Sequence, residues 1–298
     1  MGYRKLKEPL LRRIAEEVLG KDKARHIWKR IEIVGDIAII RKSFNVDVDE
    51  LKPLAEKLLE LLPHVKSVWC GVSEVKGEFR IREYTHLAGE PRSETIYREH
   101  GCLFKLDIQK VYVSPRLNYE HKRIAMKVKP GEIIVNMFAG VGLFSIIIAK
   151  YSKPQKVYSI DINPDAYKYM VESIKLNKVE GVVEPLLGDA ARVIREKLVG
   201  IADRVLMPLP GLSYEYLEYA ILALRPGYPR YIHVYDFVRA GKNEDPEEKV
   251  RTKFTSKLSK LTPRFTIEYS RIVRMVGPRR YQVVLDIVLE RPKDYNLE

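Results

Sequence analysis

The alternation of predicted strands and helices between residues 132 and 235 constrains the fold most strongly. The strands are predicted at 132–137, 156–160, 182–187, 203–207 and 230–235, and the helices between them at 143–151, 166–177, 190–198 and 214–224. Such alternation is typical of βαβ units, which build a parallel sheet. A charged helix at 246–261 precedes two strands, at 266–273 and 281–289, which flank a tight turn and should pair antiparallel. The sequence therefore predicts an α/β fold whose sheet is mostly parallel, with an antiparallel last strand.

Residues before 114 have a different character and predict a smaller α+β arrangement. Residues 4–30 are basic and predict one or two helices, with a break at Gly20. The elements predicted after them are a strand–turn–strand at 31–40, an amphipathic helix at 48–62, and strands at 65–72, 79–83 and 102–108. We therefore expect a basic helical segment at 1–30, a small α+β domain at 31–113 and the large α/β domain at 114–298.

Charge and cysteine content bound the partners and the compartment. The 298 residues hold 53 Lys and Arg against 40 Asp and Glu, a net charge of +13. An excess of this size favours a polyanion such as RNA, although a heat-adapted surface would also be rich in charge. Cys70 and Cys102 are the only cysteines, which excludes a disulfide scaffold and predicts a reducing, cytoplasmic location. No run of 18 apolar residues predicts a membrane span.

A glycine-containing loop follows the first strand of the large domain. It has the sequence Asn136-Met-Phe-Ala-Gly-Val-Gly142-Leu-Phe-Ser145. Glycines at this place let the backbone turn sharply and approach a ligand, and the helix behind them presents free N–H groups. The loop is not a P-loop and lacks a full G-x-G-x-x-G, so by itself it predicts only a small-molecule site.

Two carboxylates at strand ends narrow the choice of ligand. Asp161 ends the second strand about 20 residues beyond the glycines, where a carboxylate can accept both hydroxyls of a ribose. Asp189 ends the third strand and could accept from an adenine amino group. This arrangement favours S-adenosylmethionine over NAD or an empty sheet, and it predicts a Rossmann-like class I methyltransferase sheet.

A candidate target site precedes the first strand of this sheet. In Tyr112-Val-Ser-Pro-Arg116-Leu-Asn-Tyr-Glu120, the proline suits the first turn of a helix. Arg116 and Glu120 are then four residues apart and are expected on one helical face. A surface salt bridge is the simpler interpretation of that pair.

Five segments together resemble the archaeal and eukaryotic tRNA (guanine-37-N1)-methyltransferases. They are Ser114-Pro-Arg-Leu-x-x-Glu120, Asn136-Met-Phe-Ala-Gly-Val-Gly142, Ile160-Asp-Ile-Asn-Pro164, Asp203-Arg-Val-Leu-Met-Pro-Leu-Pro210 and Gly277-Pro-Arg-x-Tyr281. The resemblance runs from about residue 31 to the C-terminus. It implies S-adenosylmethionine as the cofactor and the anticodon loop of tRNA as the partner.

The resemblance also implies roles for single residues. Guanine N1 carries a proton, so its methylation needs a base and a donor for the charge that moves onto O6. Glu120 matches the general base and Arg80 the arginine near O6, and both are expected to be catalytic. The substrate-binding candidates are Arg116, Tyr112 and Pro210. The cofactor-binding candidates are Tyr112, Arg116, Phe138, Ala139, Gly140, Val141, Gly142, Asp161, Ile162, Asp189, Ala190 and Pro208.

Three departures from the family pattern affect these expectations. Pro208 stands where the family has asparagine, and Asn136 stands where many members have aspartate. Only about 30 residues precede the α+β domain, which leaves no room for the N-terminal domain that often reads the outer corner of the tRNA. The basic residues flank the candidate site instead: residues 225–280 hold 14 Lys and Arg against 6 acids.

Other functions remain open on the sequence. The related wybutosine-pathway aminocarboxypropyltransferase has the same fold and cofactor, but it usually has other residues where Arg116-Leu117 and Pro208-Leu209 stand here. Methylation of a wyosine precursor at the same position is a further alternative, and a non-catalytic RNA-binding protein is a third. We expect a monomer without a metal ion, because the six histidines show no ligand-like spacing.

Overall fold

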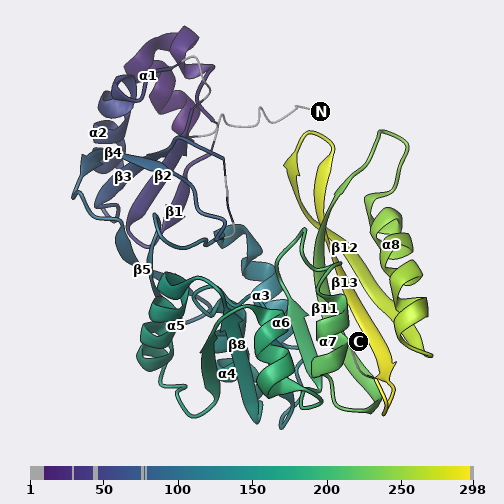
Figure 1. Ribbon diagram of the computed structural model, residues 1–298. Helices are drawn as coiled ribbons and strands as arrows, with labels where there is room; N and C mark the ends of the chain where they lie inside the picture. Colours follow the sequence, from purple (N-terminus) through teal and green to yellow (C-terminus); the bar gives the residue numbers. More distant parts are fainter. Residues whose placement is uncertain (1–9, 29, 43–45, 75–76, 78, 296–298) are drawn as a thin grey trace, which may run out of the picture. The chain divides into compact units, whose positions relative to one another are not determined.

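The computed structural model describes residues 10–28, 30–42, 46–74, 77 and 79–295 (Figure 1). The chain divides into two compact units, residues 1–115 and residues 116–298. Each unit is described by itself.

The first unit contains a four-stranded sheet in the order β1–β2–β3–β4 and a separate hairpin of β5 and β6. Its elements are α1 (Leu10–Ala24), β1 (Glu32–Val34), β2 (Ile37–Arg41), η1 (Asp49–Leu51), α2 (Lys52–Leu61), β3 (Ser67–Gly71), β4 (Tyr84–Gly89), β5 (Glu94–Glu99) and β6 (Cys102–Asp107). β2 and β3 pair parallel, and the other neighbours pair antiparallel.

Helix α1 shares the core of this unit. Its two parts meet at a kink at Gly20, whose φ of 78° breaks the helix where the sequence predicts a break. Leu11 and Ile14 on α1 are buried in the same apolar cluster as Leu54 and Leu58 on α2. The apolar side of the N-terminal helix is therefore covered, and its basic residues lie on the other side.

Two features of the first unit differ from the sequence prediction. The strand predicted at 79–83 is wrong, because Arg80 adopts a left-handed φ of 53° in a turn closed by its N–H and the carbonyl of Gly77, and a left-handed residue cannot continue a strand. The strand in this region is β4, which begins at Tyr84. Strand β5 was not predicted, because the apolar residue Ile96 is exposed and the charged residue Glu99 is buried, the reverse of what a sequence pattern assumes.

The second unit is an α/β sandwich around a seven-stranded sheet. Its helices are η2 (Pro115–Leu117), which begins at the last residue of the first unit, α3 (Asn118–Ala125), α4 (Leu143–Ser152), α5 (Pro164–Asn177), α6 (Ala190–Val193), the π-turn η3 (Ile194–Leu198), α7 (Leu217–Ala223) and α8 (Pro246–Leu261). Its strands are β7 (Ile133–Asn136), β8 (Lys156–Asp161), β9 (Val183–Leu187), β10 (Arg204–Met207), β11 (Gly227–Arg239), β12 (Phe265–Gly277) and β13 (Arg280–Arg291).

The sheet has the order β12–β13–β11–β10–β7–β8–β9. The five strands from β11 to β9 are parallel, and β13 lies between β11 and β12, antiparallel to both. This arrangement confirms the predicted Rossmann-like class I methyltransferase sheet with an antiparallel last strand. Because β12 runs in the direction of β11, it ends at the same edge of the sheet.

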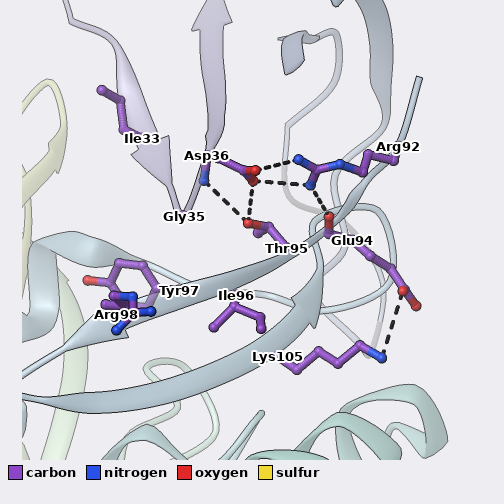
Figure 2. Close-up of a pocket in the computed structure, with 10 residues that line it drawn as sticks. All are labelled: Ile33, Gly35, Asp36, Arg92, Glu94, Thr95, Ile96, Tyr97, Arg98 and Lys105. Atoms are coloured by element: carbon purple, nitrogen blue, oxygen red, sulfur yellow. Dashed lines mark hydrogen bonds and ion pairs between the residues drawn. The ribbon is translucent and has the colours of Figure 1, made fainter. Parts of the chain in front are cut away.

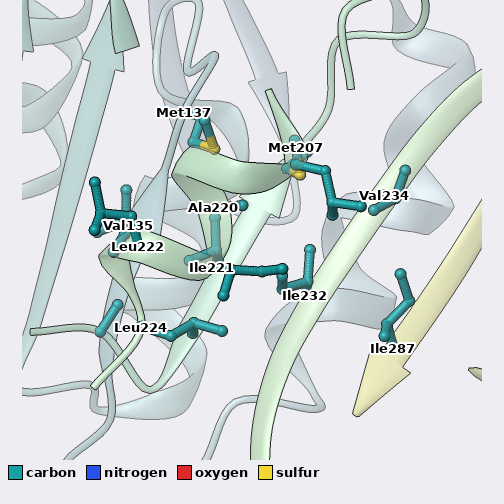
Figure 3. Close-up of a cluster of buried hydrophobic side chains, with 14 of the residues drawn as sticks. Val135, Met137, Met207, Ala220, Ile221, Leu222, Leu224, Ile232, Val234 and Ile287 are labelled. Carbon is teal, nitrogen blue, oxygen red and sulfur yellow. The ribbon is translucent and has the colours of Figure 1, made fainter. Parts of the chain in front are cut away.

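Apolar residues of α6, α7 and α8 pack with the sheet strands into one buried cluster (Figure 3). Ile221 of α7 and Phe254 of α8 are fully buried in it, together with Val205 of β10 and Ile232 of β11. Helix α7 begins at Leu217, three residues later than predicted. The Ser213 hydroxyl lies within hydrogen-bond distance of the backbone carbonyls of Met207 and Tyr235. These bonds hold the preceding segment as a turn.

Candidate functional site

The site candidates of the second unit lie at the carboxyl edge of the parallel sheet. Strands β7, β8 and β10 end at Asn136, Asp161 and Met207, and adjacent strands are in register there. Parallel strands that end at one edge bring the loops behind them together. The glycine loop, the residues after Asp161 and the Pro208–Pro210 segment therefore emerge side by side.

The glycine loop folds over the end of β8. The Ala139 N–H donates to the carbonyl of Ile160 at 2.8 Å, and the Gly140 N–H donates to Asp161 Oδ2 at 2.6 Å. Gly142 has a φ of 88°, and a Cβ there would meet Ile146 at 3.2 Å, so a side chain would be strained and crowded. Glycine at this position therefore allows the loop to enter α4.

Asp161 presents a carboxylate that is held from one side. Oδ2 accepts from Gly140, and Oδ1 accepts the N–H of Asn163 at 2.9 Å. Burial raises the pKa of Asp161, and the backbone N–H groups of Asn163 and Gly140 partly oppose that rise. A carboxylate has about four lone-pair sites, so each oxygen retains one for a further donor. A ribose with two neighbouring hydroxyls matches that requirement.

Asp189 already has two partners. As the N-cap of α6, its Oδ1 accepts the N–H of Arg192 at 2.9 Å, and its Oδ2 accepts the Tyr216 hydroxyl at 2.6 Å. The Tyr216 ring packs edge-on against Phe138 with centroids 5.4 Å apart. The sequence reasoning missed Tyr216, which joins the predicted Asp189 to the predicted Phe138 and gives this end of the site an aromatic wall.

Asn136 has an unsatisfied polar atom at the end of β7. Its side chain is fully buried, and Nδ2 donates to the Ser145 hydroxyl at 3.1 Å. Within the described part of the chain, Oδ1 has no hydrogen-bond partner. A buried acceptor without a partner costs free energy unless a ligand supplies a donor. An S-adenosylmethionine ammonium group would supply one, so the residues present fit this cofactor.

The Pro208–Pro210 segment is fixed from both sides. The Ser213 hydroxyl donates to the carbonyl of Leu209 at 3.0 Å, and the N–H of Gly211 donates to Asp236 Oδ1 at 3.2 Å. Asp236 is buried and also pairs with Lys253 at 2.6 Å. Pro208 and Pro210 therefore lie in a rigid turn at the sheet edge, as a wall for a flat target would require.

Glu120 is buried, with only 1% of its surface exposed. Its Oε2 accepts from Arg123 Nε and from the Tyr235 hydroxyl, each at 2.9 Å, and its Oε1 accepts from Arg271. Burial and the Glu120 charge raise the pKa of Tyr235, so this hydroxyl remains a donor. A carboxylate oxygen bonded to a guanidinium can accept a substrate proton only when that donor moves. Arg271, whose side chain is 35% exposed, is the partner that reaches solvent most easily.

The Glu120 cluster continues into a buried charge network under α3. Arg123 bridges Glu120 to Asp286, with its NH1 at 2.6 Å from Asp286 Oδ2, and Asp286 Oδ1 lies 2.7 Å from His233 Nδ1. His233 Nε2 lies 2.7 Å from Arg204 NH1. Because arginine only donates, Nε2 accepts and Nδ1 carries the proton. Burial lowers the pKa of His233, which agrees with a neutral ring.

The remaining candidates lie on or beside the first unit. Arg80 occupies the turn described above, and Tyr112 is 40% exposed near the end of that unit. Arg116 lies in the 3-10 turn η2 and is exposed, whereas Glu120 is buried in α3, which follows η2 directly. The pairing of these two side chains stays a prediction.

A separate hollow of about 730 Å³ lies in the first unit between β1 and the β5–β6 hairpin (Figure 2). Its charges are largely paired: Arg92 NH1 lies 3.1 Å from Asp36 Oδ1, and Lys105 lies 3.9 Å from Glu94. The Arg92 hydrogen bond lowers the pKa of Asp36 and keeps this pair ionised. The hollow contains none of the residues that the sequence singled out.

No group of three or more His, Cys, Asp or Glu side chains among the described residues could hold a metal ion. In the same part of the chain, no helix is both long and apolar enough to cross a membrane.

Known protein families match almost the whole chain. The sequence profile described as "TRM5/TYW2 methyltransferase domain" matches residues 95–261, and that described as "TYW2 N-terminal domain" matches residues 11–92. A relative from Saccharolobus solfataricus, named tRNA 4-demethylwyosine(37)-methyltransferase Taw21, is 45% identical over 88% of this chain and 94% of its own length.

Two further relatives have names that include Trm5. The tRNA (guanine(37)-N(1))-methyltransferase Trm5b of Pyrococcus abyssi is 41% identical over 88% of this chain and 75% of its own length. The solved structure titled "The complex structure of aTrm5 and tRNALeu" superposes with a TM-score of 0.80 at 35% identity. It covers 97% of this chain, and this chain covers 80% of it.

Proposed function

Because the chain belongs to the TRM5/TYW2 methyltransferase family, we propose that it transfers a methyl group from S-adenosylmethionine to the base at position 37 of tRNA. The observation that supports this most directly is the strand-edge site, where the Gly140 N–H and the Asp161 carboxylate meet at 2.6 Å. S-adenosylmethionine supplies an activated methyl group on its sulfonium. The chain supplies a carboxylate for the ribose, an aromatic wall at Phe138 and a buried acceptor at Asn136.

We propose N1 of guanosine as the first acceptor. Its proton must leave during transfer, and Glu120 is the carboxylate that we propose as the base. Glu120 Oε1 accepts this proton once Arg271 has moved, while Arg123 and Tyr235 keep Oε2 in place. Arg80 stabilises the charge on O6. Arg116, Tyr112 and Pro210 border the base.

Most of the residues proposed for the cofactor follow the ends of strands β7, β8, β9 and β10. The full set is Tyr112, Arg116, Phe138–Gly142, Asp161, Ile162, Asp189, Ala190 and Pro208. All except Tyr112 belong to the second unit. Asp161 would orient the ribose, and the N–H groups at the start of α4 would face the ligand.

A second acceptor, 4-demethylwyosine at the same position, has its own support. The relative named for that reaction is 45% identical and nearly the same length, since this chain covers 94% of it. The relative named for guanosine N1 is 41% identical, and this chain covers 75% of it. Shared length favours the wyosine precursor, whereas the resemblance of the Arg116–Glu120 segment favours a methyltransferase over an aminocarboxypropyltransferase and leaves both acceptors open.

Nucleoside mass spectrometry tests the reaction and separates the acceptors. The purified protein is incubated with S-adenosylmethionine and either an unmodified tRNA transcript with guanosine at position 37 or a tRNA that carries 4-demethylwyosine there. A methyl increment on N1 of guanosine confirms the first acceptor. A methyl increment only on the wyosine precursor selects the second. An aminocarboxypropyl increment, or no product on either tRNA, contradicts the proposal.

A further inference from the structure

The β12–β13 hairpin extends well past the carboxyl edge of the sheet. Strand β10 ends at Met207, opposite Val234 of β11, but β11 continues for five more residues to Arg239. At about 3.3 Å per residue, this end stands roughly 16 Å beyond the edge. Arg239 is opposite Arg280, and Arg280 is opposite Gly277, so the tip of the hairpin reaches the same level. Figure 1 shows the yellow hairpin and the green segment after β11 projecting together.

The hairpin part of this projection is basic. Residues 270–285 contain four arginines and no acid. Arg239 and Arg280 face each other directly in the β11–β13 register. Like charges at directly opposed positions destabilise a sheet. Arg280 stacks over the Phe237 ring, with its guanidinium carbon 4.8 Å from the centroid, and Arg239 is exposed. An anion above the two side chains would interact favourably with both charges.

Apolar side chains stand exposed at the same tip. Met275 is 63% exposed and Val276 is 38% exposed. An exposed apolar group beside arginines suits a partner that presents both phosphates and flat apolar faces, which is the chemistry of single-stranded or looped RNA. A purely basic surface would need only the phosphates.

We propose that residues 237–243 and 272–281, which we call the arginine tip, bind the anticodon arm of the tRNA. This inference rests on the proposed tRNA substrate. The arginines neutralise phosphates near the target nucleotide, and Met275 and Val276 lie against unstacked bases. The tip rises from the edge at which the glycine loop and the Pro208–Pro210 segment lie, so it stands beside the proposed base-binding site.

The test compares two double variants with equal loss of charge. Arg239→Gln/Arg280→Gln removes the opposed pair at the tip. Lys260→Gln/Arg264→Gln removes two exposed cations at the opposite end of β12. Binding is measured against salt, with an unmodified tRNA transcript that has guanosine 37 and with its isolated anticodon stem-loop. The tip variant should bind both RNAs about tenfold more weakly at low salt, with a salt slope reduced by roughly 1.5. The control should match wild type.

Two further readouts exclude a merely structural effect. The melting temperature of the tip variant should stay close to that of wild type, because both side chains are exposed and are not part of the core. Met275→Ser should weaken binding severalfold without changing the salt slope. Unchanged affinity and slope in the tip variant, with wild type still binding and methylating tRNA, would overturn this inference and leave the proposed function intact. A loss seen with whole tRNA but not with the stem-loop would also overturn it. If wild type itself neither bound nor modified tRNA, both proposals would fall.

Discussion

At the scale of single residues, Glu120 provides the clearest test of chemistry. Glu120→Gln retains the size and keeps an oxygen for Arg123, but it cannot take a proton. We expect the single-turnover rate of methyl transfer to fall by about 10²- to 10⁴-fold. The dissociation constant of S-adenosylmethionine, measured by calorimetry, should stay within about twofold. Glu268→Gln, on the exposed side of β12, is the control. A rate close to wild type would show that another group takes the proton.

Asp161 makes a prediction about cofactor affinity and pH. Asp161→Asn should weaken S-adenosylmethionine binding by about 1.5–3 kcal/mol, because hydrogen bonds from two hydroxyls to a charged acceptor are weakened. Burial raises the native pKa of this carboxyl, so it protonates at a higher pH than an ordinary aspartate. Affinity should therefore fall on acidification from a pH above the usual aspartate range, and the Asn variant should lack that fall. Calorimetry from pH 4 to pH 8 measures both effects.

The sequence predicts residues whose position depends on local structure, and it misses partners that only the fold brings close. The proximity of Asp161 and Gly140 could be predicted from the sequence, since the end of one strand and the glycine loop after its neighbour meet where two parallel strands are adjacent. The partners of Glu120 could not. Tyr235 lies 115 residues and Arg271 lies 151 residues away in the chain. Arg123, three residues after Glu120, was the one partner that helical spacing could have suggested.

At the scale of elements, the buried charges that link α3 to the sheet should contribute to the free energy of unfolding. Arg123 ties α3 to Asp286 on β13, and Lys127 lies 3.0 Å from the same carboxylate. Burial opposes ionisation of Asp286, but His233 and Arg123 outweigh it and hold the pKa of that carboxyl below its usual range. Asp286→Asn takes one of two carboxylate partners from the buried Arg123 guanidinium and leaves Glu120 as the other. It should lower the free energy of unfolding by about 3 kcal/mol at pH 7.

The pH dependence of that effect follows from the sign of the shift. A carboxyl whose native pKa is depressed stabilises the fold above its unfolded pKa of about 3.9 and loses that contribution as pH falls toward the native value. Urea unfolding should therefore show a gap between wild type and Asp286→Asn that is full at pH 7 and narrows below about pH 4. The same gap at both pH values would contradict an ionic role. Asp294→Asn, exposed near the C-terminus, is the matched control.

Errors in the predicted elements have two physical causes. At 79–83, the apolar and β-branched residues favour a strand, but the left-handed turn at Arg80 prevents it. In β5, Glu99 shares the buried face with Thr95 and Tyr97, and the Tyr97 hydroxyl donates to it at 2.8 Å, so a charged residue lies inside and hides the strand pattern in the sequence. Both are tertiary effects on short segments. The longer βαβ elements were predicted because the spacing of their apolar residues and the length of each segment indicate the same type of element.

At the scale of the whole molecule, the positive charge and the core of the first unit are linked through α1. The basic residues of α1 stand on a helix whose Leu11 and Ile14 are buried with α2. Deleting residues 1–28 would therefore remove core as well as charge, and a loss of tRNA binding would have two explanations. Replacing exposed Arg13 and Lys21 by Gln removes charge alone, so that variant isolates the electrostatic contribution of this segment.

The two units have separate apolar cores, one around α1 and α2 and the other around the seven-stranded sheet. We expect two unfolding transitions in calorimetry, because units with their own cores need not melt together. Leu54→Ala should lower the free energy of unfolding of the first unit by about 3 kcal/mol, and Ile221→Ala should lower that of the second unit by a similar amount. S-adenosylmethionine at 100 times its dissociation constant should stabilise the transition lowered by Ile221→Ala by about 2.7 kcal/mol, because most of its proposed contacts lie in that unit. If the cofactor instead raised the transition that Leu54→Ala lowers, the assignment of the strand-edge site would be wrong.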